Sequence, residues 1–199
     1  MRGYMRDQFE YLGLNSPERR RANKPWITQG KSAEAEDLLT FAEECWEENE
    51  REFQYCAMDV LRAGAKELEP KHLPRVRARI ETKSWWDTID SLGPWTVGTM
   101  VTSHPELSAV MDEWIDDDNH WVARSAILHQ LGYKERTDGD RLFSYADKRG
   151  GDTEFFIRKA LGWALRQYAR VDPDAVRAYV EDNADMLSGL TKREALKHL

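Results

Sequence analysis

Hydrophobic residues recur along this chain at the spacing of amphipathic helices. Between residues 31 and 47 they occupy one stripe, at steps of three, four and seven positions, and residues 50–66 repeat the pattern. Strand signals are almost absent, because alternating runs of β-branched and aromatic residues on either side of an Asn-Gly or Asp-Gly turn do not occur. The pattern therefore predicts an all-α protein.

Prolines and glycines divide this helical pattern into segments. Ser16 before Pro17 and Asp172 before Pro173 predict two helix starts, each with a capping residue followed by proline at the first helical position. The proline and glycine breaks divide the chain into about eleven or twelve predicted helices joined by short turns. The breaks are expected at Lys24-Pro25, Glu69-Pro70, Gly93-Pro94, His104-Pro105, Gly139 and Gly150-Gly151.

The second half of the chain divides into helix pairs with a period between 34 and 40 residues. Asp90, Arg124 and Trp163 each fall in or near the second helix of a pair, and 34 and 39 residues separate them. A HEAT or armadillo unit has this size, with two antiparallel helices stacked on the next two. We predict one domain, residues 1–199, folded as a right-handed solenoid of HEAT-like antiparallel helix pairs with a concave groove. A compact helical bundle with accidental spacing is the alternative.

Length and composition exclude several classes of protein. The 199 residues suffice for one ordinary domain, and 41% hydrophobic with 33% charged residues excludes a disordered chain. No stretch approaches the roughly 18 unbroken apolar residues that a bilayer crossing needs, and the first residues hold no signal-peptide core. Cys45 and Cys56 are compatible with a reducing cytosol. No two histidines are four positions apart, so the sequence indicates no metal site. We expect a protein of the bacterial cytoplasm that binds no metal and has no membrane partner.

The net charge of −7 argues, as a sum, against a nucleic-acid partner. The signs are segregated, however, with acids crowded into residues 43–52 and 112–118 and basic residues gathered elsewhere. We interpret the acidic runs as solvated outer helices. The acidic total can therefore hide a cationic groove, to which the basic run containing Arg19 and Arg20 would contribute DNA contacts.

The segment KSWWDTID, residues 83–90, is the most informative for chemistry. Ser84 is predicted to cap a helix, with Asp87 three residues later as in a capping box. Trp86 and Asp90 are four residues apart and are therefore neighbours on one helix face. One interpretation is a half-exposed aromatic beside a solvated carboxylate, and the other is an indole placed over a functional carboxylate.

Arg124 interrupts the largely apolar stretch 121–131. Arginine is almost never fully buried without a partner, so Arg124 either reaches solvent or pairs with an acid. Asp90, on the preceding repeat, is the candidate acid. An ordinary salt bridge between repeats explains this pattern as well as a functional site does.

Residues 155–166 carry cations and an aromatic on one helix face. Lys159, Trp163 and Arg166 stand at steps of four and seven along it. An aromatic flanked by cations is typical of a surface that lines phosphates and stacks bases, although most aromatic stripes at helical spacing are simply core. Gly162 indicates close approach of another helix and favours neither interpretation.

Together with Tyr4-Met5 and the run FEYLG before SPER, these segments resemble the AlkD family of bacterial DNA alkylation repair glycosylases. The resemblance extends from Tyr4 to Lys197, although members of the family carry about one more helix before the tyrosine. It implies a stack of HEAT-like helix pairs whose concave surface embraces duplex DNA. Three motifs carry it in this order: S-W-W-D-T-x-D, R-[ST]-A-I-L-x-Q-L and F-I-x-K-A-[IL]-G-W-x-L-R.

The activity that this resemblance implies is removal of cationic N3- or N7-alkylated purines from duplex DNA, by hydrolysis of the N-glycosidic bond. Family members work without metal or cofactor and without swinging the lesion into a pocket as other glycosylases do. The chain would then be a base excision repair enzyme that acts as a monomer. The alternative is a non-catalytic HEAT-like module that binds distorted or branched DNA, or a protein, in the same groove.

The resemblance also assigns roles to single residues. The catalytic carboxylate of the family matches Asp90, its neighbouring tryptophan Trp86, and its active-site arginine Arg124. The second lesion-facing tryptophan matches Trp163, and the tyrosine that closes the site matches Tyr4. The further candidates for DNA binding, from the charge pattern, are Lys159, Arg166, Arg19 and Arg20.

Overall fold

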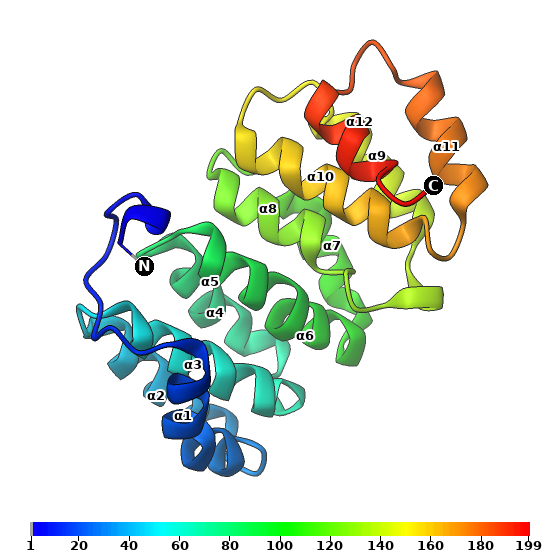
Figure 1. Ribbon diagram of the computed structural model, residues 1–199. Helices are drawn as coiled ribbons and strands as arrows, with labels where there is room; N and C mark the ends of the chain where they lie inside the picture. Colours follow the sequence, from blue (N-terminus) through cyan, green and yellow to red (C-terminus); the bar gives the residue numbers. More distant parts are fainter. Residues whose placement is uncertain (1) are drawn as a thin grey trace.

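The computed structural model describes residues 2–199 as a stack of helices (Figure 1). Within these residues there is no strand of a sheet, only an isolated bridge between Glu10 and Glu50, so the all-α prediction is confirmed. No helix of this part of the chain combines the length and the apolar character that crossing a bilayer requires. The α-helices are α1 (Ser16–Gly30), α2 (Ala35–Glu47), α3 (Arg51–Gly64), α4 (Leu73–Glu81), α5 (Trp86–Ser91), α6 (Gly98–Ser103), α7 (Ser108–Trp114), α8 (His120–Leu128), α9 (Gly139–Arg149), α10 (Phe155–Tyr168), α11 (Pro173–Asp182) and α12 (Gly189–Ala195).

Shorter helical segments join these elements. Five are 3₁₀ turns, and the sixth, η4, is a π-helical segment between α5 and α6. They are η1 (Gly3–Met5), η2 (Ala65–Glu67), η3 (Pro70–His72), η4 (Leu92–Val97), η5 (Pro105–Leu107) and η6 (Lys134–Arg136).

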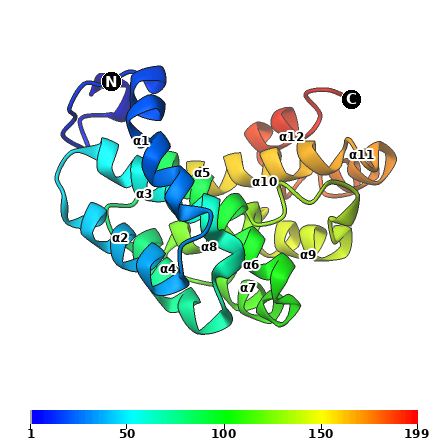
Figure 2. The ribbon, with the colours of Figure 1, turned by 90° about the horizontal axis from the view of Figure 1, so that it is seen from below.

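The stack is curved. In Figure 2 the N-terminal and C-terminal helices rise on either side of the middle ones, while α2, α4, α7 and α9 lie along the opposite, outer side. One hydrophobic core runs through the stack, from Leu38 in α2 to Ala195 in α12. Polar contacts between neighbouring helix pairs join residues at a regular distance, slightly shorter than the predicted period of 34–40 residues. A tyrosine hydroxyl donates to an aspartate 32 or 33 residues away at three places, from Tyr55 to Asp87, from Tyr145 to Asp112 and from Tyr179 to Asp147.

The expected break at Gly93-Pro94 is wrong, because residues 86–103 form one continuous helix through η4. Pro94 has no N–H to donate to the carbonyl of Asp90, four residues earlier, so the ordinary α pattern cannot continue there. The helix widens instead, and the N–H of Gly98 bonds to the carbonyl of Gly93, five residues back. The candidate carboxylate of Asp90 therefore lies two residues before a π segment within a long helix.

The first helix also differs from its prediction. Pro25 lies inside α1 rather than at a break, on an exposed stretch of the helix, and has no N–H to donate to the carbonyl of Arg21. The capping residue is Asn15 rather than Ser16, since the Asn15 side chain accepts from the backbone N–H of Glu18 at 3.0 Å. The later cap is confirmed, because Asp172 accepts from the backbone of α11.

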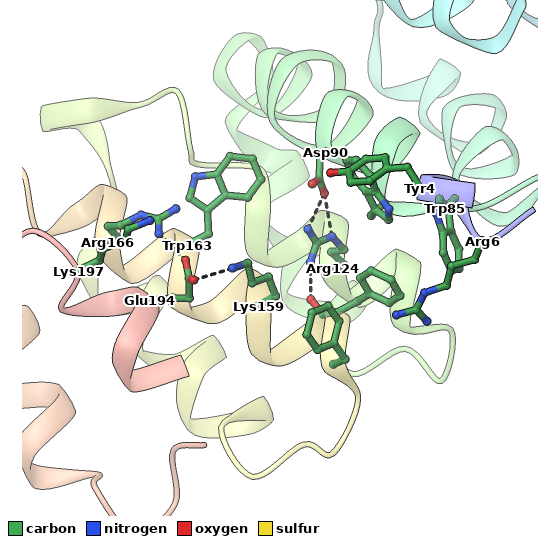
Figure 3. A pocket seen from close by; sticks show the side chains of 13 residues that line it. Tyr4, Arg6, Trp85, Asp90, Arg124, Lys159, Trp163, Arg166, Glu194 and Lys197 are labelled. Carbon is green, nitrogen blue, oxygen red and sulfur yellow. Dashed lines mark hydrogen bonds and ion pairs between the residues drawn. The ribbon is translucent and has the colours of Figure 1, made fainter. Parts of the chain in front are cut away.

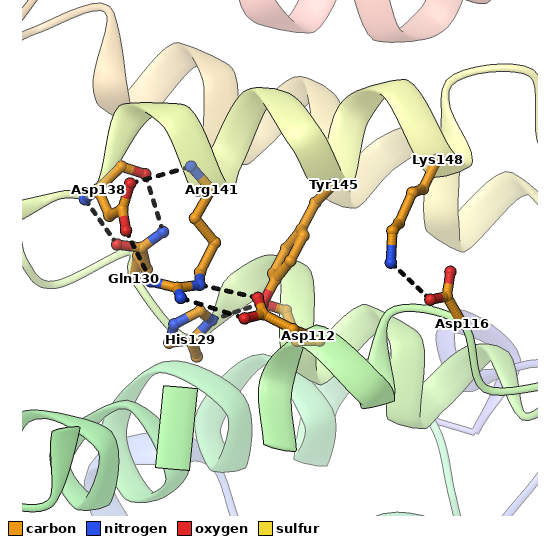
Figure 4. A network of polar contacts seen from close by, with 9 residues as sticks. Asp112, Asp116, His129, Gln130, Asp138, Arg141, Tyr145 and Lys148 are labelled. Carbon is orange, nitrogen blue, oxygen red and sulfur yellow. Dashed lines mark hydrogen bonds and ion pairs between the residues drawn. The ribbon is translucent and has the colours of Figure 1, made fainter. Parts of the chain in front are cut away.

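A polar network fixes α9 against α7 (Figure 4). Arg141 bonds to both oxygens of Asp112, at 2.8 and 3.1 Å, and the hydroxyl of Tyr145 donates to the same carboxylate at 2.7 Å. Lys148 pairs with Asp116 at 2.5 Å in an exposed ion pair. The acidic run of residues 112–118 is thus not merely a solvated face, because two of its carboxylates anchor the next helix pair.

His129 lies under this network and is almost fully buried. Burial lowers its pKa to about 4, and its Nδ1 atom lies 2.6 Å from the carbonyl oxygen of Ala126. A histidine in this position is neutral at physiological pH and serves packing.

Helix α12 packs against α10 at Gly162, as the close approach expected there requires. A Cβ atom at this position would lie 2.5 Å from the Cβ of Glu194 and 2.9 Å from the carbonyl oxygen of Thr191. The neighbouring backbone cannot retreat without moving α12 as a whole. Glycine at this position therefore brings α12, and with it Glu194, close to α10.

We expect Gly162→Ala to destabilise the protein by about 1–2 kcal/mol, since overpacking against backbone outweighs the improvement of about 1 kcal/mol in helix propensity. Urea unfolding followed by circular dichroism measures the change. Gly151→Ala is the control, because a Cβ there meets nothing within 4 Å. Equal stability of the two variants would contradict the packing argument.

Candidate functional site

A cavity of about 510 Å³ opens between α5, α8, α10 and α12 (Figure 3). Seven of the nine predicted site residues line it, together with further aromatic and charged side chains. The predicted residues are Tyr4, Trp86, Asp90, Arg124, Lys159, Trp163 and Arg166, and the others are Arg6, Trp85, Phe155, Phe156, Glu194 and Lys197.

The predicted pairing of Arg124 with Asp90 is present. The Nε and Nη2 atoms of Arg124 donate to the same oxygen, Oδ1, of Asp90, at 2.9 and 2.6 Å. Nη1 donates to the backbone carbonyl of Phe156. The arginine side chain is 2% exposed and the aspartate side chain 21%. Arg124 therefore does not reach solvent, and within residues 2–199 no side chain or backbone group donates to the second oxygen, Oδ2, of Asp90.

The pKa of Asp90 is raised above its ordinary value. Burial is the largest cause, and the charge and hydrogen bonds of Arg124 act against it without cancelling it. The negative charge of Asp87 adds to the rise. The cavity thus holds a carboxylate that is a stronger base than an ordinary aspartate.

Asp87 is held by a second buried arginine that sequence reasoning missed. Arg51, at the start of α3, is fully buried and donates to Asp87 from Nε at 3.0 Å and from Nη2 at 2.6 Å. The hydroxyl of Tyr55 donates to the same carboxylate at 2.6 Å. Ser84 does not cap α5 as predicted, because its hydroxyl donates to a carbonyl of the preceding helix. The sequence offered one signal for a second structural acid here. Asp87 and Asp90 are three residues apart, so both lie on one side of α5.

Aromatic rings form the walls of the cavity. Tyr4, from η1, meets the ring of Trp86 edge-on with the ring centroids 5.8 Å apart, and it is 76% exposed. Trp85 packs on Phe156 at 5.3 Å, and both contact Trp121 beneath. Tyr4, Trp85, Trp86 and Phe156 line the cavity together with Asp90. In Figure 3, Trp163 lies on the other side of Asp90 from Tyr4 and Trp85.

Lys159 and Arg166 are in the cavity but are not free cations. Glu194, on α12, accepts from Lys159 at 2.6 Å through one oxygen and from Arg166 through the other. The hydrogen bond from Lys159, with that from Arg166, lowers the pKa of Glu194. Gly162 indicated the close helix in the sequence, but the pattern did not show which side chain that helix brings.

The cavity is cationic although the chain is acidic. Five cations and two carboxylates line it, a net charge of +3, in a chain of net charge −7. The charge segregation expected from the sequence therefore exists at this site. The cations are Arg6, Arg124, Lys159, Arg166 and Lys197, and the carboxylates are Asp90 and Glu194.

Arg19 and Arg20 are the two predicted residues that do not reach the cavity. Helix α1 packs against α3, and the guanidinium of Arg19 lies 4.4 Å from the ring centroid of Tyr55. Arg20 is exposed on α1. Arg19 therefore braces the tyrosine that bonds to Asp87, and a DNA contact by either arginine stays a prediction.

Within residues 2–199, no group of three or more His, Cys, Asp or Glu side chains is arranged to hold a metal ion. Cys45 and Cys56 are both buried as free thiols.

The whole sequence, residues 1–199, matches the family model described as DNA alkylation repair enzyme. This chain belongs to that family. A solved structure described as a predicted DNA alkylation repair enzyme from Enterococcus faecalis is 30% identical, with a TM-score of 0.91 over 100% of this chain and 92% of that one. The comparison with curated proteins gives no match.

Two more distant structures share the fold. AlkD2 from Streptococcus mutans is 16% identical, with a TM-score of 0.72 over 99% of this chain and 96% of that one. The smu.31 protein from Streptococcus mutans UA159 is 17% identical, with a TM-score of 0.70 over 90% of this chain and 92% of that one. The AlkD-like resemblance and the helical repeat fold are thus both confirmed.

We expect Arg124→Met to lower the free energy of unfolding by about 3–5 kcal/mol at neutral pH, because it leaves the Asp90 carboxylate buried without its partner. The pKa of Asp90 should rise further, so the native state binds a proton more tightly than the unfolded chain does. The deficit in stability should therefore grow as the pH rises through that raised pKa.

Urea unfolding at several pH values, with an NMR titration of the Asp90 carboxyl carbon, measures both effects. Lys148→Met is the matched control, since it breaks the exposed pair with Asp116 and should cost no more than about 1 kcal/mol. An unchanged pKa of Asp90 in Arg124→Met would show that Arg124 does not control this carboxylate.

Proposed function

We propose that this protein is a DNA N-glycosylase that hydrolyses the N-glycosidic bond of cationic N3- or N7-alkylated purines in duplex DNA. One observation carries the proposal. A single carboxylate, Asp90, has one oxygen fixed by the buried Arg124, and the other left for a ligand in a cationic cavity walled by aromatic rings.

The substrate class follows from what this site contains. An alkylated purine that already carries a positive charge leaves as a neutral base when the bond from C1′ to the base nitrogen breaks, so it needs no general acid. The bonding electrons go to the base, and the sugar becomes an oxocarbenium-like cation, as in glycoside hydrolysis generally. An anion placed near C1′ stabilises this positive charge, and Asp90 is the carboxylate in the cavity that is not already shared between two cations.

The size of the effect is sufficient for catalysis. Two unit charges about 4 Å apart interact by about 4 kcal/mol at an effective dielectric constant of 20. If this energy acts mainly on the transition state, it raises the rate on the order of a thousandfold. Burial of the carboxylate favours this use, because few water molecules compete for the charge.

Asp90 also fits the second half of the reaction. Water attacks C1′ and must lose a proton, which a carboxylate within hydrogen-bond distance can accept. The raised pKa of Asp90 makes it a better proton acceptor than an ordinary aspartate. Arg124 is a positioning residue in this scheme, since its donors are directed to Asp90 and to the backbone rather than into the cavity.

The rings supply binding rather than chemistry. Trp86 and Trp163 offer π faces to the sugar and to the cationic base, and each cation–π contact is worth ~0.5–2 kcal/mol. Tyr4 lies against Trp86 at the open side, where it would limit the access of bulk water.

Asp90→Asn should reduce base release on the order of a thousandfold, because the amide keeps the shape but removes the charge. The assay is release of 7-methylguanine from a methylated duplex under single-turnover conditions. Duplex binding and circular dichroism of the variant control for folding, and Asp116→Asn controls for the change in net charge. Release at the parental rate would overturn the assigned mechanism, and salt-sensitive binding by the parent without release would favour the non-catalytic module.

Glu194→Gln should tighten binding to undamaged duplex DNA, because it frees Lys159 and Arg166 for phosphates. The dependence of log K on log salt should steepen by roughly 0.9 for each additional phosphate that the variant neutralises. Fluorescence anisotropy at several salt concentrations measures both quantities. Asp116→Asn makes the same charge change beside Lys148, outside the cavity, and an equally tightened complex there would show that only net charge matters.

A further inference from the structure

A second aromatic and basic surface lies further along the helix that carries Asp90. Trp95, in η4, is 36% exposed and borders a separate cavity of about 170 Å³. Two neighbouring residues, Gly132 and Arg62, restrict the position of its indole ring. A Cβ at Gly132 would lie 2.8 Å from the ring, and the guanidinium of Arg62 lies 4.4 Å from the ring centroid. This exposed ring is therefore held in one position rather than left free at the surface.

One exposed cation, Arg62, lies over this ring, and two more, Lys66 and Arg136, line the same cavity as Trp95; we call these four residues the Trp95 surface. They come from the C-terminal end of α3, from η2 and from η6. No carboxylate lines the cavity, and none of the three cations forms an ion pair within the part of the chain that the structure describes.

Several other cations of this protein are paired with carboxylates, whereas among residues 2–199 the three of the Trp95 surface are not. Arg75, Arg77 and Arg141 each bond to carboxylates from a neighbouring element. Glu67 and Glu135, the sequence neighbours of Lys66 and Arg136, do not line the cavity. Three unpaired cations beside a fixed indole form a surface suited to a polyanion with apolar sugar faces.

The distance from Asp90 indicates which part of a DNA ligand would reach this surface. Trp95 follows Asp90 by five residues on one helix, which is at most about 7.5 Å along the axis, because the π segment rises less per residue than an α-helix. The minor and major grooves of B-DNA are about 6 and 12 Å wide. Two sites at this separation match two backbones that face each other across a groove.

We propose that the Trp95 surface binds phosphates of the strand opposite the damaged one, with Trp95 packed on its sugars. The inference rests on the proposed function, which places the damaged strand at Asp90. It goes further by assigning the preference for duplex over single-stranded DNA to these four residues. A single strand held at Asp90 lacks the second backbone and leaves the Trp95 surface empty.

The test is a triple variant, Arg62→Gln, Lys66→Gln and Arg136→Gln, all at exposed positions. Fluorescence anisotropy measures its binding to an undamaged duplex and to one of the two strands alone. At about 0.1 M salt we expect at least tenfold weaker duplex binding, with a salt slope shallower by roughly 2–3, and unchanged binding to the single strand.

The matched control is a second triple variant, Lys71→Gln, Lys148→Gln and Arg177→Gln, which removes the same charge at exposed positions that line neither cavity. An equal loss in the control, an equal loss for single-stranded DNA, or no loss for the duplex would each overturn the proposal. Base release by the parental protein tests the proposed function separately. If the parental protein releases the base and the triple variant still prefers duplex DNA, only the role of the Trp95 surface is contradicted.

Discussion

The buried side chain of Arg124 is the constraint on which the site depends. A guanidinium taken out of water must find acceptors, because an unpaired charge in the interior is strongly destabilising. Arg124 takes its acceptors from both neighbours in the stack, the carboxylate of Asp90 on α5 and the carbonyl of Phe156 at the start of α10. One side chain thereby joins α5, α8 and α10 where the cavity forms. The same contact uses only one oxygen of Asp90, so the other oxygen remains without a donor from the described residues of the cavity.

Helix α5 carries two carboxylates three residues apart, and each is neutralised by its own buried arginine. Arg51 reaches Asp87 from α3, and Arg124 reaches Asp90 from α8. The two acids differ in how many of their carboxylate oxygens already accept hydrogen bonds. Asp87 also accepts from the hydroxyl of Tyr55, so both of its oxygens are engaged, whereas Asp90 keeps one oxygen toward the cavity. The number of donors around each carboxylate, rather than its residue type, separates a structural acid from a candidate catalytic one.

Sequence reasoning reached the fold class, the approximate repeat distance and the cavity residues that lie on predicted helix faces, such as Asp90 and Trp163. It failed where contacts between repeats decide the outcome. Glu194 is 28 residues from Arg166, and no local pattern shows that it pairs with this cation. Pro94 is a helix breaker by local rules, yet packing on both sides keeps the helix continuous by widening one turn. Short-range periodicity predicts which face a residue occupies, but not which partner the next helix brings to it.

The net charge of an acidic DNA repair enzyme is a poor guide to its partner because screening makes electrostatics local. At physiological ionic strength the Debye length is about 8 Å, so a phosphate entering the cavity interacts mainly with the charges that line it. These sum to +3, although the chain carries −7. Part of the acidic excess is engaged on the outer helices, where Asp112 bonds to Arg141 and Tyr145. Carboxylates that hold the outer layer together lower the net charge without opposing an anion on the inner side.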